Sequence, residues 1–131
     1  MKDNNHTILI VEDDEVSCSL FREIFEQENI KSYLIVKTGE QAVEVCKNNE
    51  NIGLVLLDLR LPGITGFETL KRIKKIRKRL TVIAETACVV PDAKEIYRKL
   101  GFDDFIGKPI INNELLELIK KYNAPVLKLS T

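Results

Sequence analysis

The sequence has few of the residues that build disulfide-stabilised or metal-thiolate domains. Its three cysteines, Cys18, Cys46 and Cys88, are odd in number and far apart, and none forms a Cys-x-x-Cys pair. This argues against a disulfide framework or a zinc site and fits a reducing, cytoplasmic compartment. The single histidine, His6, lies in a polar amino-terminal stretch, where we do not expect a metal ligand.

Long apolar runs and an excess of one charge are also missing. No apolar stretch approaches the roughly 20 residues that cross a bilayer, and the polar start lacks the apolar core of a secretion signal. Twenty lysines and arginines balance twenty aspartates and glutamates. The net charge therefore gives no reason to expect contact with nucleic acid or a membrane.

One local stretch departs from this balance, because seven of the nine residues from 71 to 79 are basic. Ile73 and Ile76 interrupt it at a helical spacing, so we expect the apolar pair to pack on the core and the charges to face solvent. A docking patch for an acidic partner is the alternative. Nucleic acid is less favoured, because no aromatic residues are interleaved and no recognition-helix motif is present.

What is present is an alternation of strand-like and helix-like segments. We expect strands at 7–11, 32–36, 54–58, 81–85 and 102–106, and helices at 15–27, 41–47, 67–76, 91–100 and 112–122. Gly39 is expected to break the chain before the second helix, and Pro91 to lie in the first turn of the fourth. Either Asn112 or Asn113 is expected to cap the last helix.

Strict alternation of this kind predicts a parallel sheet with right-handed crossovers and helices on both faces. At 131 residues the chain suits one domain. We expect a flavodoxin-like, doubly wound α/β fold with a five-stranded parallel sheet of strand order 2-1-3-4-5. The domain is expected to span residues 7–122, between a disordered tail at 1–6 and a carboxyl-terminal tail at 123–131.

Acidic residues end two of the expected strands. Asp58 closes one apolar run and precedes a turn with Pro62 and Gly63, while Glu12 and Asp13 follow another run. In the expected order these two strands are neighbours, so the carboxylates can share a site where open α/β sheets bind ligands. Carboxylates gathered in this way repel each other unless a divalent cation lies among them.

The chemistry open to such a site is phosphoryl transfer, because a carboxylate can attack phosphorus and form an acyl phosphate. Asp13 and Asp58 could supply two ligands to Mg²⁺, with Glu12 acting through water and the main-chain carbonyl of Arg60 as a third. Two other groups would lie at the same edge, Lys108 as a charge on a phosphate oxygen and Thr86 as a hydroxyl. Each residue alone has a simpler explanation, such as acidic residues that favour a helix dipole, but the combination is specific.

Four segments, residues 8–14, 56–63, 83–87 and 101–109, resemble the receiver domain of two-component response regulators. The resemblance implies that Asp58 is the phosphoryl acceptor and that Glu12 and Asp13 are the acidic pair that binds Mg²⁺. It further implies that Thr86 and Lys108 contact the phosphoryl group. Phe105 would hold the aromatic switch position, and the Lys108–Pro109 bond would be cis.

The implied function is a signalling domain that accepts a phosphoryl group from a sensor histidine kinase in a Mg²⁺-dependent reaction. It would catalyse only its own phosphorylation and dephosphorylation. Thr86 would move toward the phosphoryl group and Phe105 would turn inward, which changes the surface of the fourth helix, fifth strand and fifth helix. A monomer or a weak phosphorylation-dependent dimer is expected. The alternative is a receiver segment of a hybrid histidine kinase that passes the phosphoryl group to a histidine phosphotransfer protein.

Some residues depart from the family pattern. Glu85 occupies a position that is usually apolar, and it must either face the output surface or point inward and need a partner for its charge. Phe105 replaces a frequent tyrosine. Arg60 and Cys88 flank the expected path of an attacking water molecule, and we expect them to set the lifetime of the acyl phosphate.

Other classes of protein fit less well. A Mg²⁺-dependent phosphatase of the haloacid-dehalogenase type would carry a second aspartate two residues after the first, where this chain has Arg60. A flavin-binding protein of the same fold would need a phosphate-cradling loop in place of the acidic residues 12–14. The Gly-x-x-x-x-Gly-Lys pattern of P-loop hydrolases is missing.

Overall fold

The structure is a computed structural model that describes residues 7–123. Five strands and five helices alternate along this part of the chain: β1 (Thr7–Val11), α1 (Glu15–Gln27), β2 (Tyr33–Val36), α2 (Gly39–Asn48), β3 (Ile52–Asp58), α3 (Gly66–Ile76), β4 (Thr81–Thr86), α4 (Ala93–Leu100), β5 (Asp104–Gly107) and α5 (Asn112–Tyr122). All strand pairs are parallel, and the order is β2-β1-β3-β4-β5, which confirms the expected fold. Of the expected tails at 1–6 and 123–131, residues 1–6 and 124–131 lie outside the described residues.

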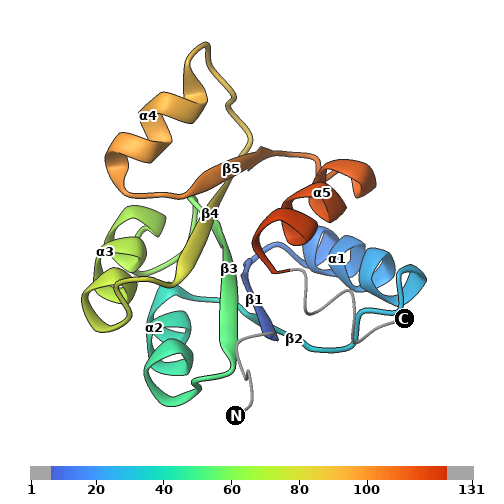
Figure 1. Ribbon diagram of the computed structural model, residues 1–131, viewed down its shortest axis with the longest axis horizontal. Helices are drawn as coiled ribbons and strands as arrows, with labels where there is room; N and C mark the ends of the chain where they lie inside the picture. The colour runs from blue at the N-terminus through green and yellow to red at the C-terminus, as the bar shows by residue number, and fades with distance from the viewer. Residues whose placement is uncertain (1–6, 124–131) are drawn as a thin grey trace.

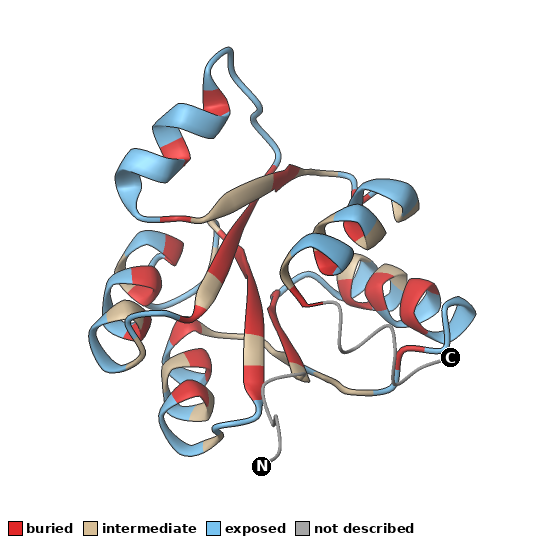
Figure 2. Ribbon diagram, viewed as in Figure 1, coloured by how far each residue is buried: buried red, intermediate tan, exposed pale blue. Residues whose placement is uncertain are grey.

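Helices cover both faces of the sheet. Figure 1 shows α1 and α5 on one face and α2, α3 and α4 on the other. Because side chains alternate along a strand, Ile8 and Ile10 pack toward α1 and α5, whereas Leu9 and Val11 join the opposite core. The central strands are buried along most of their length, while α4 is largely exposed (Figure 2). Such double coverage explains why the strands are continuous apolar runs.

Side-chain caps start three helices shortly after strand ends. Asp14 accepts a hydrogen bond from the Ser17 N–H at 2.9 Å and begins α1. Thr38 forms a capping box with Gln41 at the start of α2, and Thr65 caps α3. Each cap satisfies a backbone donor that the helix itself leaves free. The caps also fix the loops at the carboxyl edge of the sheet.

Several expected helix boundaries are wrong. Gly39 does not break the chain but is the first residue of α2, where an added Cβ would lie 2.0 Å from Thr69 Oγ1. Pro91 lies before α4 rather than in its first turn. The N-cap residue, Asp92, takes a left-handed conformation with φ of 63°, and the helix begins after it. Neither expected asparagine caps α5: Asn112 is already helical, and Ile111 holds the cap position without a side-chain hydrogen bond.

The apolar spacing also predicted a wider buried face than two of the helices have. Val16 is 77% exposed, and α1 instead buries Cys18, Phe21, Ile24 and Phe25. In the basic stretch, Ile73 is buried as expected but Ile76 is 44% exposed. Val16 is the second residue of α1 and Ile76 is the last residue of α3, so both lie at a helix end.

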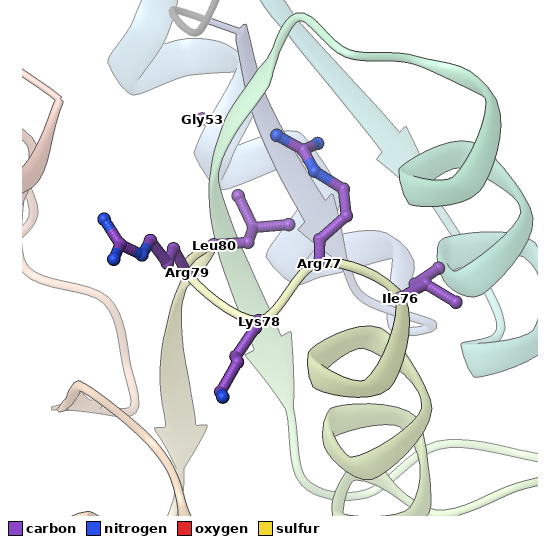
Figure 3. A pocket seen from close by; sticks show the side chains of 6 residues that line it. All are labelled: Gly53, Ile76, Arg77, Lys78, Arg79 and Leu80. Carbon is purple, nitrogen blue, oxygen red and sulfur yellow. The ribbon is translucent and has the colours of Figure 1, made fainter.

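The basic stretch borders a hollow at the amino-terminal edge of β3 and β4. It has a volume of about 430 Å³ and is lined by Gly53 and residues 76–80 (Figure 3). Arg77 Nη1 donates to the Asn49 carbonyl at 3.3 Å, and Lys74 Nζ donates to the Leu80 carbonyl at 2.7 Å. Part of the stretch therefore ties α3 to neighbouring loops. Among residues 7–123, no helix is long and apolar enough to span a membrane.

Candidate functional site

Three carboxylates lie in a row across neighbouring strands at the carboxyl edge of the sheet. Asp58, the last residue of β3, pairs with Glu85 of β4, and Val11 of β1 pairs with Leu57. Glu12 therefore follows its strand beside Asp58. Residues that pair directly in parallel strands point to the same face. The row continues the face that packs on α1 and α5, and each of the three acidic residues is buried.

Lys108 joins two members of the row. Its Nζ lies 3.0 Å from Asp58 Oδ2 and 3.0 Å from Glu12 Oε1. Only the contact with Asp58 has hydrogen-bond geometry, and Glu12 Oε1 has no hydrogen-bond partner among the described residues. Burial opposes the charge of Lys108, but its contacts with Glu12 and Asp58 outweigh burial and raise its pKa. The ammonium is therefore held in its charged form.

Backbone groups fix the remaining oxygens of Asp58 and Glu12. Asp58 Oδ1 accepts the Arg60 N–H at 3.0 Å, and Glu12 Oε2 accepts the Asp14 N–H at 3.1 Å. Hydrogen bonds from N–H groups to a carboxylate are among the stronger ones in proteins. Both side chains are therefore oriented before any ligand binds.

Glu85 is a fully buried member of the row, and its polar neighbour is Glu12. Two carboxyl groups can form a hydrogen bond only while one of them keeps its proton. Burial, and then the neighbouring charge of Glu12, raises the pKa of Glu85 well above its usual range. Burial also raises the pKa of Glu12, although its contacts with Glu85 and Lys108 act in the opposite direction.

A pocket of about 270 Å³ opens beside Asp58. Its lining combines carboxylates, a lysine and a hydroxyl: Asp58, Leu59, Arg60, Phe67, Glu85, Thr86, Ala87, Cys88 and Lys108. Thr86 Oγ1 accepts the Cys88 N–H at 3.0 Å and donates to the Cys88 carbonyl at 3.2 Å. The hydroxyl is thus held by the loop after β4 rather than by Asp58. The predicted residues Asp58, Arg60, Thr86 and Lys108 are brought together here.

Asp13 stands apart from the buried row. It is exposed, and it forms no ion pair within the part of the chain that the structure describes. No group of three or more ligating side chains is arranged for a metal among residues 7–123. Mg²⁺ needs fewer, because one or two carboxylates usually hold it together with water and phosphate oxygens. The neighbouring carboxylates of Glu12 and Asp58 fit that donor set.

Phe105 lies on β5 and is not part of the row of carboxylates. It is half-buried, and its ring centroid is 5.6 Å from that of Tyr97 on α4. It also lines a shallow hollow of about 580 Å³ between β5 and α5, together with Val89, Asp104, Ile106, Gly107, Glu114, Glu117 and Leu118. A change in this ring would therefore alter a surface formed by α4, β5 and α5. The Lys108–Pro109 bond is cis, as predicted.

The sequence left the orientation of Glu85 open, and the structure turns it inward. The signal was available in the strand pattern, because Ile83 and Glu85 alternate with Ala84 and Thr86 along β4. Ile83 belongs to the core beneath α1 and α5, so Glu85 must point to that face too. Only the register with β3, which the sequence does not give, places it beside Asp58.

The amino-acid sequence matches a known domain family. The family model of the response regulator receiver domain matches residues 8–120. Sporulation initiation phosphotransferase F of Bacillus subtilis is 35% identical over 118 residues, which cover 90% of this chain and 94% of that protein.

Solved structures agree on the fold. The receiver domain of the sensor histidine kinase PA1611 from Pseudomonas aeruginosa, solved with magnesium in its active-site cleft, has a TM-score of 0.79 and 24% identity, with coverage of 92% of this chain and 98% of that chain. The receiver domain of Ssk1 from Saccharomyces cerevisiae, solved with the histidine phosphotransfer protein Ypd1, has a TM-score of 0.81 and 24% identity, with coverage of 95% and 92%.

Proposed function

Because this chain belongs to the response regulator receiver domain family, we propose that it carries a phosphoryl group on Asp58 in two-component signalling. The observation that supports this most strongly is the contact of Lys108 Nζ with both Asp58 and Glu12, two buried carboxylates at the carboxyl edge of the sheet. A nucleophilic carboxylate, a second acidic group and a fixed cation are the parts that phosphoryl transfer to a side chain needs. The donor is a phosphohistidine on a sensor histidine kinase.

In the transfer step an oxygen of Asp58 forms a bond to phosphorus and the P–N bond of the phosphohistidine breaks. The electron pair leaves with the imidazole nitrogen, which takes a proton from solvent. Lys108 turns from the carboxylate to a phosphoryl oxygen, and Thr86 exchanges its bonds with Cys88 for the same group. The Arg60 N–H keeps one side of the Asp58 carboxylate in place.

Glu12, Asp13, Asp58 and the main-chain carbonyl of Arg60 would hold Mg²⁺. The ion supplies positive charge against the phosphoryl oxygens in the transition state. The repulsion between the neighbouring carboxylates of Glu12 and Asp58 supports this assignment. A solved relative with the same fold contains magnesium in its active-site cleft.

We infer that phosphorylation is read out on the α4–β5–α5 surface through Thr86 and Phe105. Phe105 is only half-buried and packs on Tyr97, so it has room to rotate when the hydroxyl of Thr86 leaves Cys88. The same surface would support a monomer or a weak phosphorylation-dependent dimer.

Cysteines Cys18, Cys46 and Cys88 are free thiols, which supports action in the reducing cytoplasm. We propose that the chain catalyses only its own phosphorylation and dephosphorylation.

A phosphorelay intermediate is the second candidate. The 35% identical relative is named a phosphotransferase and is matched over 94% of its length, and one structural neighbour was solved with a histidine phosphotransfer protein. This role adds a return step, in which a histidine on the partner takes the phosphoryl group from Asp58. Rapid loss of label from the phosphorylated chain to a purified histidine phosphotransfer protein of the same organism would identify it, in a stand-alone protein or a hybrid kinase.

Arg60 and Cys88 line the pocket around Asp58, and we propose that they set the lifetime of the acyl phosphate. Both can control how water approaches the phosphorus. The decay rate of the phosphorylated protein should change in Arg60→Ala and in Cys88→Ala. Unchanged rates in both variants would remove this role.

The direct test is incubation with acetyl phosphate and Mg²⁺, followed by intact mass measurement. We expect one phosphoryl adduct on the wild-type chain and none on Asp58→Asn. Asp92→Asn is the control, because Asp92 is exposed and far along the chain in a left-handed conformation that asparagine tolerates. An unlabelled wild-type chain, or an adduct that survives in Asp58→Asn, would overturn the assignment.

A further inference from the structure

The basic stretch at residues 71–79 has no task in the proposed chemistry. Two of its seven cations form ion pairs, Arg72 with Glu68 and Lys74 with Asp103. The other five form no ion pair within residues 7–123: Lys71, Lys75, Arg77, Lys78 and Arg79. The whole chain carries no net charge, so this is a local concentration of positive charge, and like charges repel each other at short range.

The fold accounts for only part of this charge. α3 ends at Ile76, and the basic residues of its last turn, Lys74 and Lys75, favour the negative end of the helix dipole. That effect falls off within one turn, so it does not explain a cation at Arg79, three residues beyond the helix. Lys78 and Arg79 are exposed, and the side chain of neither is tied to another group among the described residues. Both cations are therefore available to a partner.

These cations border a hollow rather than a flat surface. The hollow has a volume of about 430 Å³, and part of its lining is apolar or lacks a side chain: Gly53, Ile76 and Leu80. Figure 3 shows that the side chains of Arg77, Lys78 and Arg79 leave the turn between α3 and β4 in different directions. Cations that diverge do not close around one small anion. An extended chain with several carboxylates can meet each of them in turn.

A second hollow of the same size shows that this charge pattern is not general. It has a volume of about 420 Å³ and lies beside α1, where Glu26 accompanies the cations Arg22 and Lys31 in its lining. The hollow after α3, which we call the basic hollow, is lined by Gly53 and residues 76–80, with three cations and no carboxylate. A surface that serves only solubility mixes both signs of charge. The basic hollow instead favours an anionic partner.

We propose that the basic hollow is a docking site for an acidic segment of a partner protein. Carboxylates of the segment meet Lys78 and Arg79, and an apolar side chain of the segment packs on Ile76, which is 44% exposed. Opposite charge on the two surfaces steers the encounter and selects the partner. Nucleic acid fits less well, because none of the lining residues is an aromatic on which a base could stack.

The basic hollow is separate from the phosphorylation site. Gly53 is the second residue of β3 and Asp58 is the last, so the two lie roughly 17 Å apart along the strand. An acidic segment bound at the basic hollow would leave Asp58 open to a phosphoryl donor. The docking proposal therefore does not depend on the proposed phosphoryl transfer.

Binding of a defined peptide tests the proposal on the whole chain. The probe is a short fluorescein-labelled peptide in which glutamates alternate with leucines, and fluorescence anisotropy measures its Kd at low salt. A second peptide has glutamine in place of each glutamate, and a third has alanine in place of each leucine. We expect the first peptide to bind most tightly. Its binding should weaken as salt is added, because salt screens exposed charges.

Variants at the basic hollow should weaken this binding. We expect the double variant Lys78→Gln, Arg79→Gln to raise the Kd about five- to tenfold, the effect of two exposed ion pairs. The matched control is Arg22→Gln, Lys31→Gln, which removes the same charge from the second hollow and should keep the wild-type Kd. Ile76→Ser should raise the Kd of the leucine peptide about threefold and leave that of the alanine peptide unchanged. All five side chains are exposed, and circular dichroism with thermal melting shows that each variant is folded.

Several outcomes would overturn the proposal. It fails if the wild type does not bind the acidic peptide, or if the double variant at the basic hollow loses no more affinity than the control. Tighter binding of a thymidine oligonucleotide of equal length, or of vesicles of phosphatidylcholine and phosphatidylserine, would mean that the surface serves nucleic acid or a membrane instead. Labelling of Asp58 by acetyl phosphate should proceed equally in the wild type and the double variant, and slower labelling in the variant would contradict the separation of the two sites.

Discussion

Lys108 Nζ lies 3.0 Å from Asp58 Oδ2, and this hydrogen bond connects residues that are 50 positions apart in the sequence. The same ammonium lies 3.0 Å from Glu12. One lysine therefore holds together two carboxylates that would otherwise repel each other. In the chain without cation or phosphoryl group, it is the main compensation for the acidic row, so its loss should affect stability as well as phosphorylation.

We predict that Lys108→Met lowers the free energy of unfolding at pH 7 by about 1–3 kcal/mol, measured by urea denaturation without metal. Removal of one partner from a buried ion pair leaves the other charges uncompensated. The side chain of Lys108 is 20% exposed, so the loss should stay below that of a fully buried pair. Added Mg²⁺ should restore part of the loss.

Lys121→Met is the matched control for this measurement. Lys121 forms an ion pair with Asp104 at 3.5 Å, but its own side chain is 53% exposed. Exposed pairs contribute little, because solvent screens them. The prediction for Lys108 is wrong if both variants lose the same stability, or if Mg²⁺ stabilises Lys108→Met no more than it stabilises the wild type.

Glu85→Leu should have the opposite effect on stability. Because the pKa of Glu85 is raised in the folded chain above its usual value of 4.5, the folded state binds the proton more tightly than the unfolded state. Stability of the wild type therefore falls as pH rises from 4.5 through the raised pKa. We predict that Glu85→Leu raises the free energy of unfolding at pH 7 by about 1–3 kcal/mol without metal.

The pH dependence distinguishes this cause from better packing. The gain from Glu85→Leu should shrink as pH falls toward 4.5, where the unfolded chain also keeps the proton. Urea denaturation at pH 7 and pH 5 gives the comparison. An equal gain at both values would mean that the leucine acts through apolar burial and that the charge of Glu85 costs the fold nothing.

Much of this site could be predicted from the sequence, because its residues lie at ends of strands that are easy to recognise. Asp58 ends an apolar run, and the fold class places that end beside Glu12. Lys108 follows a third strand and reaches the same edge. These residues depend only on strand order, which the alternation of elements predicts. The resemblance to receiver domains adds roles to them but no geometry.

The features that the sequence did not give depend on register and on close packing. The place of Glu85 beside Asp58 follows only from the pairing of the two residues. Gly39 was expected to break the chain, but it begins α2 at a point of close approach, as Gly66 begins α3. Pro91 was expected in the first turn of α4, but Asp92, with its left-handed backbone, separates it from the helix. Local propensity does not report such tertiary contacts.

Gly66 connects the packing of α3 to the phosphorylation site. An added Cβ would lie 2.7 Å from the carbonyl oxygen of Asp58 and 2.7 Å from Cα of Leu59. Backbone atoms cannot move aside as a flexible side chain can. We predict that Gly66→Ala lowers the free energy of unfolding by about 2–3 kcal/mol and slows labelling by acetyl phosphate, because relief of the clash displaces Asp58.

Gly107→Ala is the control for this effect. Its Cβ would lie 3.1 Å from Cγ2 of Val89, an exposed side chain that can turn away. Chemical denaturation and the rate of adduct formation should both stay near wild-type values. The role assigned to Gly66 does not hold if the two alanine variants behave alike.

Thiol reactivity should report on the same pocket, because one of the three cysteines lies in it. Cys88 is exposed and lines the pocket beside Asp58, whereas Cys18 and Cys46 are buried. Burial raises the pKa of Cys46 to about 11, and burial also raises the pKa of Cys18. Since the thiolate is the reactive form, we predict that iodoacetamide at pH 8 adds one label to the folded chain quickly.

Intact mass measurement over time gives the count, and the same reaction in denaturant should reach all three thiols. Cys88→Ser should abolish the fast label and leave the slow ones. Occupation of Cys88 by the carboxamidomethyl group places extra volume in a pocket of about 270 Å³, so the labelled chain should accept a phosphoryl group from acetyl phosphate more slowly than the unlabelled one. Fast labelling of two or more thiols in the folded chain would mean that α1 or α2 opens away from the sheet, and the buried positions of Cys18 and Cys46 would then be wrong.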